Sequence, residues 1–147
     1  MPIIIRKALL SDTEKLARVF LDSRRHTFYW QDPEQFQLED FEKQTEGEVV
    51  VLAENEEGTV LGFISVWEHE LPPFIHHLYI AQDHQRKGIG RLLIQDLISW
   101  LPLPYRLKCL TRNKNALAFY KKTGWIEVEV GFSEGEEYLL LELPPPA

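Results

Sequence analysis

A short basic segment containing two glycines is the part of this 147-residue sequence best suited to bind an anion. It lies between an apolar run that predicts a strand and a segment whose apolar residues recur on one helical face. Glycines let the backbone turn closely around a ligand, and the first amides of the following helix have no partner within it. These amides therefore point at any bound anion, such as a pyrophosphate. The segment consists of Gln85, Arg86, Lys87, Gly88, Ile89, Gly90 and Arg91.

Two common nucleotide-binding motifs do not fit this segment. A dinucleotide fingerprint needs a third small residue where the chain has Leu93, and a P-loop ends in Gly-Lys followed by Ser or Thr, which this segment lacks. Taken alone, the segment is equally well explained as a glycine turn that joins a strand to a helix.

The sequence on both sides of the segment carries a more specific signal. Leu78, Tyr79 and Ile80 precede it, and Asn113-Lys114-Asn115-Ala116-Leu117-Ala118-Phe119-Tyr120-Lys121-Lys122-Thr123-Gly124-Trp125 follows it. Together these motifs resemble the GNAT superfamily of acyl-CoA-dependent N-acetyltransferases. The resemblance covers nearly the whole chain. It implies a single N-acetyltransferase domain over residues 1–147 with an α/β (α+β) fold: a mixed, mostly antiparallel, splayed sheet of about six or seven strands flanked by about four helices.

The resemblance also implies acetyl-CoA as the co-substrate and assigns residues to it. The backbone of Gln85 to Arg91 would surround the coenzyme A pyrophosphate, and the basic side chains of that segment would supply its counter-charge. The pantetheine arm would run along the strand at Leu78 to Ile80 like an additional strand. Asn113 aligns with the asparagine of the family that contacts the cofactor.

Tyr120 aligns with the tyrosine that protonates the departing thiolate in this family. The assignment is chemically reasonable, because a phenol with an ordinary pKa of about 10 is protonated at neutral pH and can donate to a thiolate. The alternative for Tyr120 is a core aromatic on a helix.

The general base is less well defined. Protein-lysine members of the family place a glutamate where this chain has Phe74, and ribosomal-protein N-terminal acetyltransferases place one where it has Lys108. Both departures argue against those substrates.

Four other side chains are candidates for the base. His76 is favoured over His77, Glu68 and Glu70, and any of them could act through water. The alternative for each histidine is a surface or structural role without catalysis.

The function predicted from these residues is transfer of an acetyl group from acetyl-CoA to a primary amine of a small molecule or peptide. An acyl-CoA-binding or sensing module that kept the cofactor site and lost its base is the alternative.

The rest of the sequence predicts the elements that hold these residues. Apolar patterns predict strands near 3–5, 48–53, 60–67, 74–80, 105–110, 125–131 and 136–143, and helices over about 11–25, from about 33, over 89–101 and over 113–123. Ser11 and Glu14 have the spacing of a capping box. Leu107 and Cys109 should point into the core, and Gly124 should end the last helix in a left-handed conformation.

Three consecutive aromatics, at 28–30, fall in a loop after the first helix. Packing onto the sheet is favoured for them, and a wall of the binding site is the alternative.

Charge and composition limit the partners. The chain has 16 Lys and Arg against 23 Asp and Glu, a net charge of -7, which argues against a general nucleic-acid binder. Residues 84–122 nevertheless carry nine basic residues and one acid, an island of +8 that is typical of a polyanion site or of a solvated face. The chain has one cysteine and no apolar run long enough to span a membrane, so we expect a cytoplasmic protein without a metal site or a membrane partner. The acidic net charge adds the expectation of no nucleic-acid partner.

The oligomeric state is open at this point. An edge strand near 136–143 could pair with a second copy to give a homodimer or could face solvent.

Overall fold

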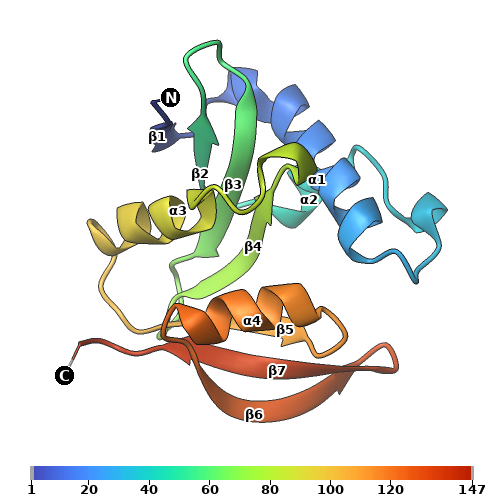
Figure 1. The fold of residues 1–147 in the computed structure, drawn as a ribbon, viewed down its shortest axis with the longest axis vertical. Coiled ribbons are helices and arrows are strands. Elements are labelled where there is room, and N and C mark those ends of the chain that lie inside the picture. Colours follow the sequence, from blue (N-terminus) through green and yellow to red (C-terminus); the bar gives the residue numbers. More distant parts are fainter. Residues whose placement is uncertain (1, 147) are drawn as a thin grey trace.

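The computed structural model describes residues 2–146, which form one seven-stranded sheet with helices on both faces (Figure 1). In chain order the elements are β1 (Ile4–Lys7), α1 (Thr13–Thr27), α2 (Asp40–Gln44), β2 (Val49–Glu54), β3 (Val60–Trp67), β4 (Phe74–Ile80), α3 (Ile89–Ile98), β5 (Tyr105–Leu110), α4 (Lys114–Lys122), β6 (Ile126–Ser133) and β7 (Glu136–Leu143). Short 3₁₀ turns lie at Leu10–Asp12, Pro33–Gln35 and Gln82–His84.

The sheet is continuous but splits in the middle. Its strand order is β1-β2-β3-β4-β5-β7-β6, and every neighbouring pair is antiparallel except β4 with β5. These two parallel strands pair at a single position, Phe74 with Arg106, and then diverge. The arrangement confirms the predicted splayed, mostly antiparallel sheet.

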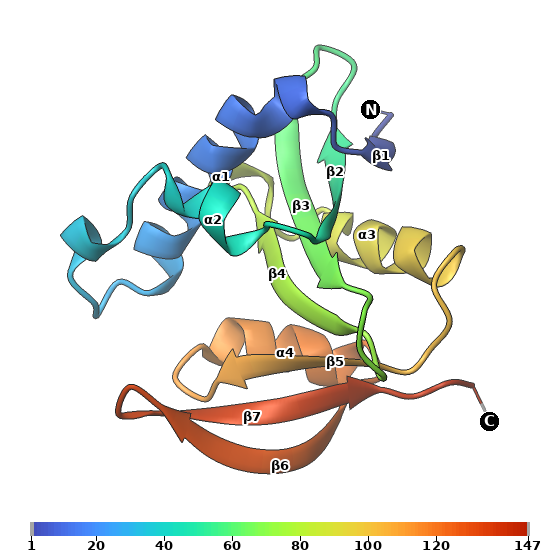
Figure 2. The same cartoon turned by 180° about the vertical axis from the view of Figure 1, so that it is seen from behind.

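Two apolar cores hold the helices on opposite faces of the sheet. Strand alternation sends Leu52 and Phe63 toward α1 and α2, where Phe20 is completely buried. The neighbouring residues Val51 and Ile64 point the other way, into the core that contains α3. Figure 2 shows α1 and α2 on the side of the sheet away from α3 and α4.

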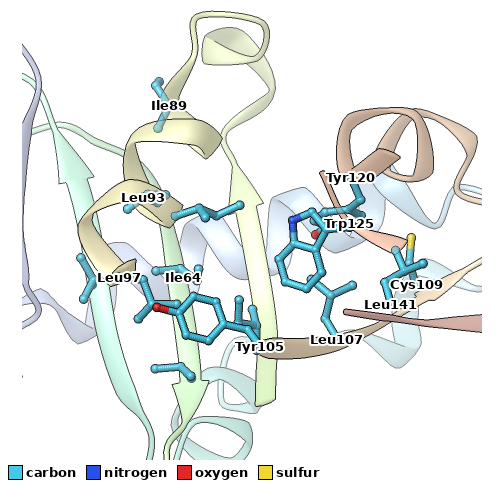
Figure 3. Close-up of a cluster of buried hydrophobic side chains, with 14 of the residues drawn as sticks. Ile64, Ile89, Leu93, Leu97, Tyr105, Leu107, Cys109, Tyr120, Trp125 and Leu141 are labelled. Carbon is cyan, nitrogen blue, oxygen red and sulfur yellow. The ribbon is translucent and has the colours of Figure 1, made fainter. Parts of the chain in front are cut away.

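The second core continues from α3 under α4 and joins the two halves of the split sheet. Leu93 and Leu97 of α3 belong to the same buried cluster as Tyr105, Leu107, Cys109, Tyr120, Trp125 and Leu141 (Figure 3). The predicted inward orientation of Leu107 and Cys109 is therefore confirmed. Gly124 has a φ of +98° directly after α4, which confirms the predicted left-handed helix end.

The start of the first helix differs from the predicted capping box. A 3₁₀ turn at Leu10–Asp12 precedes α1, and the carboxylate of Asp12 accepts the Leu9 amide at 2.7 Å. Arg6 donates two further hydrogen bonds to Asp12 at 2.8 and 2.9 Å, and these bonds lower the pKa of Asp12 to about 2. The ion pair between Asp12 and Arg6 of β1 thus stabilises the start of α1 in place of the expected Ser11–Glu14 capping box.

Two other local predictions were wrong. Pro33 begins only a 3₁₀ turn, and the second helix begins at Asp40. The strand β7 is not an edge strand, because it pairs with β5 on one side and β6 on the other. The edge strand at this end of the sheet is β6, whose exposed apolar residues are Ile126, Val128, Val130 and Phe132.

Candidate active site

A cavity of about 260 Å³ opens where β4 and β5 diverge. Residues from both faces of the sheet line it, so it connects the α4 side with the α1 side. The lining residues are Phe28, His76, His77, Leu78, Tyr79, Lys108, Cys109, Leu110, Asn113, Ala116, Tyr120, Ser133 and Tyr138. The divergence also exposes one edge of β4, with which no strand among residues 2–146 pairs beyond Phe74. Leu78 to Ile80, the predicted pantetheine strand, lie along this open edge.

The predicted phosphate-binding segment forms the turn between β4 and α3. Gly88 has a φ of +80° and is the residue before the first turn of α3, and a Cβ built at this position would meet nothing within 4 Å. Arg86 also has a positive φ, of 66°. The turn therefore leaves space in front of the α3 amides, as a bound phosphate requires.

Side chains of the same turn hold it against the strand and against itself. Gln85 donates its side-chain amide to the Ile80 carbonyl at 3.3 Å, and the Lys87 ammonium lies 3.2 Å from Nδ1 of His84. Gly90 lies against α4, since a Cβ there would come within 3.0 Å of the Phe119 ring. This contact fixes the spacing between the helix N-terminus and α4.

Tyr120 reaches the cavity from α4. The residue is only 8% exposed, and its ring packs edge-on against Trp125 with centroids 5.5 Å apart. Burial raises the pKa of Tyr120 above its ordinary value, with smaller contributions from Cys109 and Tyr79. Cys109 is itself buried, which raises its pKa to about 12. Both groups therefore keep their protons at neutral pH.

Asn113 precedes α4 and also lines the cavity. Its side-chain oxygen accepts the Ala116 amide at 3.4 Å, so the residue caps the helix. The amide nitrogen of the side chain makes no hydrogen bond to another residue among 2–146 and can donate to a ligand.

The two histidines of β4 have different environments. The pairing of β3 with β4 shifts between Ser65–His77 and Val66–Ile75, so that His76 is the extra residue of a bulge. His77 packs edge-on to Phe20 with centroids 4.8 Å apart and bonds the backbone of Gln44. Burial lowers the pKa of His77 to about 4, with smaller contributions from His76 and Arg24, so it is neutral at physiological pH.

His76 is the more accessible of the two, and its Nδ1 bonds Oε2 of Glu48. The Glu48 side chain is 4% exposed, and its other oxygen, Oε1, is buried without a hydrogen-bond partner among residues 2–146. Sequence reasoning placed Glu48 only at the start of a strand. No spacing signal connects two residues 28 positions apart, so the pair becomes visible only in the fold.

The other two candidate bases lie elsewhere. Glu68 lines a separate groove of about 410 Å³ with the proline-rich segments 71–73 and 101–104. Glu70 is exposed, and neither glutamate lines the cavity between β4 and β5.

The connection between α1 and α2 closes one side of the cavity. Phe28 lines it, whereas Tyr29 is 77% exposed, so the predicted packing of all three aromatics onto the sheet was wrong. Trp30 and Gln31 donate hydrogen bonds of 2.7 and 2.6 Å to the two oxygens of Glu136, at the start of β7. The loop thus bridges from α1 to the β6–β7 hairpin, on the far side of the split.

The architecture agrees with what comparison with known proteins shows. A sequence model of the acetyltransferase (GNAT) family matches residues 14–125. The chain belongs to this family. Membership confirms the resemblance drawn from the motifs, and the members of this family are acetyltransferases.

Individual relatives of this GNAT chain are distant in sequence. YuaI of Bacillus subtilis (strain 168), an uncharacterized N-acetyltransferase, is 28% identical over 104 residues, covering 63% of this chain and 60% of YuaI. The matched part of this chain therefore spans less than two thirds of that relative's length.

Two solved structures share the fold. The PaiA N-acetyltransferase of Thermoplasma acidophilum, solved in complex with coenzyme A, aligns with a TM-score of 0.81 at 21% identity over 99% of this chain and 100% of its own. The apo form of YjaB from Escherichia coli aligns with a TM-score of 0.77 at 22% identity over 97% and 98%. At these identities, the likeness concerns the fold of the GNAT chain.

No helix among residues 2–146 is both long enough and apolar enough to cross a lipid bilayer.

Proposed function

We propose that this chain transfers the acetyl group of acetyl-CoA to a primary amine of a small molecule or peptide by direct attack of the amine on the thioester carbonyl. The divergence of β4 from β5 carries the proposal. It leaves an open strand edge between a basic helix N-terminus and the buried phenol of Tyr120.

The residues around the split fit acetyl-CoA. The turn at Gln85 to Arg91 would hold the pyrophosphate, since Gly88 leaves space there and α3 directs its first amides into that space. The open edge of β4 at Leu78 to Ile80 would pair with the amides of the pantetheine arm, and Asn113 would donate its side-chain amide to the cofactor.

The reaction requires a proton to leave the amine and a proton to reach the sulfur. As the amine nitrogen bonds the carbonyl carbon, the carbon–sulfur bond breaks and its electron pair stays on sulfur. Tyr120 donates its proton toward the sulfur as the carbon–sulfur bond breaks, and the phenolate that remains regains a proton from solvent, which offsets the proton released by the amine.

His76 takes the proton of the amine. Its Nδ1–H donates a hydrogen bond to the Glu48 carboxylate. The lone pair on Nε2 is then free to act as the base in the cavity. Glu48 is thus a positioning residue that fixes the ring orientation and the tautomer of His76.

Two measurements test the proposal. Isothermal titration should show acetyl-CoA binding with a Kd of tens of micromolar or tighter, about 6 kcal/mol. A screen of amines by thiol release should then show turnover. His76→Gln and Glu48→Gln should lower the rate by about tenfold or more with unchanged acetyl-CoA affinity. Glu68→Gln is the matched control, because Glu68 lies outside the cavity, and its rate should not change.

One observation favours a second candidate, an acyl-CoA-binding or sensing module. The cavity lining contains no Asp or Glu among the residues described, and Lys108 stands where some relatives of the family carry a glutamate. Clear acetyl-CoA binding without turnover on any amine would support this candidate over transfer.

The same proposal keeps the cytoplasm as the location and expects no nucleic-acid partner. The single cysteine is a buried thiol and the net charge of -7 is unfavourable for nucleic acid, both of which support it. A homodimer remains a prediction that size measurement in solution would test.

A further inference from the structure

Lys108 occupies a specific place on the wall of the cavity. Its neighbours Leu107 and Cys109 point into the core beneath α4, so strand alternation turns Lys108 to the opposite face, toward α1. Phe74 and Arg106 are the last paired residues of β4 and β5, and His76 and Lys108 each follow by two positions. The two side chains therefore begin at the same level on facing walls of the split.

Charge in the cavity is one-sided. Of the lining residues, Lys108 is the one with a permanent charge, and no carboxylate lines the cavity within residues 2–146. His77 is neutral at physiological pH, because its pKa is about 4. A second ammonium or a polyamine would meet Lys108 with no compensating carboxylate.

Three arginines of this fold are already paired. Arg6, Arg24 and Arg106 each bond a carboxylate at 2.7 to 2.9 Å. The Lys108 ammonium makes no such ion pair in the part of the chain that the structure describes, and instead lies 4.9 Å from the centroid of the Tyr138 ring. An aromatic face leaves the ammonium N–H groups available to a ligand anion.

From these observations we infer that the acceptor is a small amine that also carries a carboxylate, as an amino acid does, and that Lys108 binds this carboxylate. The inference rests on the proposed acetyl transfer. Its location is consistent, since Lys108 lies on the α1 face, away from the helix N-terminus that faces the coenzyme phosphates. A positive charge nearby also favours the neutral form of the bound amine, which is the form that attacks.

The experiment compares acceptors that differ only in the carboxylate: leucine, leucinamide and isoamylamine, with spermidine as a polyamine. For the wild-type chain, kcat/KM for leucine should exceed that for each of the others by about tenfold or more. Lys108→Met should lower kcat/KM for leucine by about tenfold and change the value for leucinamide by less than about twofold. Lys108→Arg, which keeps the charge, should retain part of the preference.

The matched control is Lys15→Met, which removes one positive charge at α1 next to the β2–β3 turn, where Lys15 bonds the Gly58 carbonyl at 3.1 Å. It should leave the preference for leucine intact. The inference is overturned if leucinamide or spermidine is a better acceptor than leucine. It is also overturned if Lys108→Met lowers kcat/KM equally for all four acceptors.

A binding measurement separates this inference from the proposed function. N-acetylleucine and its amide are titrated into the chain saturated with coenzyme A, and no turnover is needed. Tighter binding of the acid that Lys108→Met abolishes supports the carboxylate site even if acetyl transfer fails. Equal binding of acid and amide overturns it.

Discussion

Tyr120 combines a hydroxyl at the cavity with a ring packed in the core, and replacing it by Phe separates the two. We expect Tyr120→Phe to leave acetyl-CoA affinity nearly unchanged and to lower the acylation rate by about 10²-fold, because the proton donor is lost. The deficit should shrink from pH 7 to pH 9, since a thiolate of pKa near 8.5 then leaves without help. Calorimetry and thiol release on one preparation provide both readouts.

Two other outcomes would contradict proton donation by Tyr120. Loss of about 1 kcal/mol of stability with full activity would show a buried hydroxyl that only satisfies a partner. A rate deficit that stays constant with pH would point to positioning of the sulfur rather than proton donation.

His77 makes stability depend on pH. Its pKa falls from the ordinary 6.5 to about 4 in the fold, first because of burial. A lowered folded-state pKa means that stability is complete above pH 6.5 and falls as the pH drops toward 4, by about 2 to 3 kcal/mol, as the unfolded chain takes up the proton first. Melting temperature measured from pH 8 to pH 4 should show this decline.

The matched variant is His77→Gln, whose side-chain amide can still donate to the Gln44 carbonyl but does not titrate. Its stability should change less between pH 6.5 and pH 4 than that of the wild-type chain. Identical pH curves for the two proteins would contradict this account of His77.

At the scale of elements, the turn into α3 is open enough to separate binding from folding. Gly88 has a φ of +80° and nothing within 4 Å of a built Cβ, so Gly88→Val meets only backbone strain, of about 1 to 3 kcal/mol. We expect the variant to fold and to lose acetyl-CoA binding, because the side chain fills the space that a phosphate needs.

Gly135 offers a matched control for this variant. It has a φ of +81° and the same open surroundings, but it lies in the β6–β7 turn. Gly135→Val should cost similar stability and retain acetyl-CoA binding. Normal acetyl-CoA affinity in Gly88→Val would place the phosphate site elsewhere.

At the scale of the whole molecule, the charge is divided between an acidic chain and a basic region. Net charge is -7, yet residues 84–122, which include the α3 turn, β5 and α4, carry +8. Dissolved salt screens these basic side chains and so weakens their attraction for a polyanion. Acetyl-CoA affinity measured by calorimetry should therefore fall by about fivefold or more between 50 and 500 mM salt. An affinity that is independent of salt would show that backbone amides, not these side chains, dominate phosphate binding.

Much of the fold follows from local sequence. The strands from Val49 to Trp67, the helix α3 and the left-handed Gly124 were predicted, because alternation, helical periodicity and glycine conformation are properties of neighbouring residues. The order of the motifs predicted a cofactor-binding segment for the same reason, since the proposed site is built largely from one turn and the helix that follows it.

Contacts between distant segments were decided only by the tertiary structure. The bulge at His76 brings its ring to Glu48, and the α1–α2 connection reaches Glu136 across more than 100 residues. The sequence alone does not show that Lys108 lines a cavity, because the cavity forms only where β4 and β5 separate. A sequence pattern reports which face of an element a residue occupies, whereas the partner on that face depends on how strands pair and where pairing ends. The cofactor side of the proposed site could therefore be predicted from sequence, whereas its acceptor side depends on the split in the sheet.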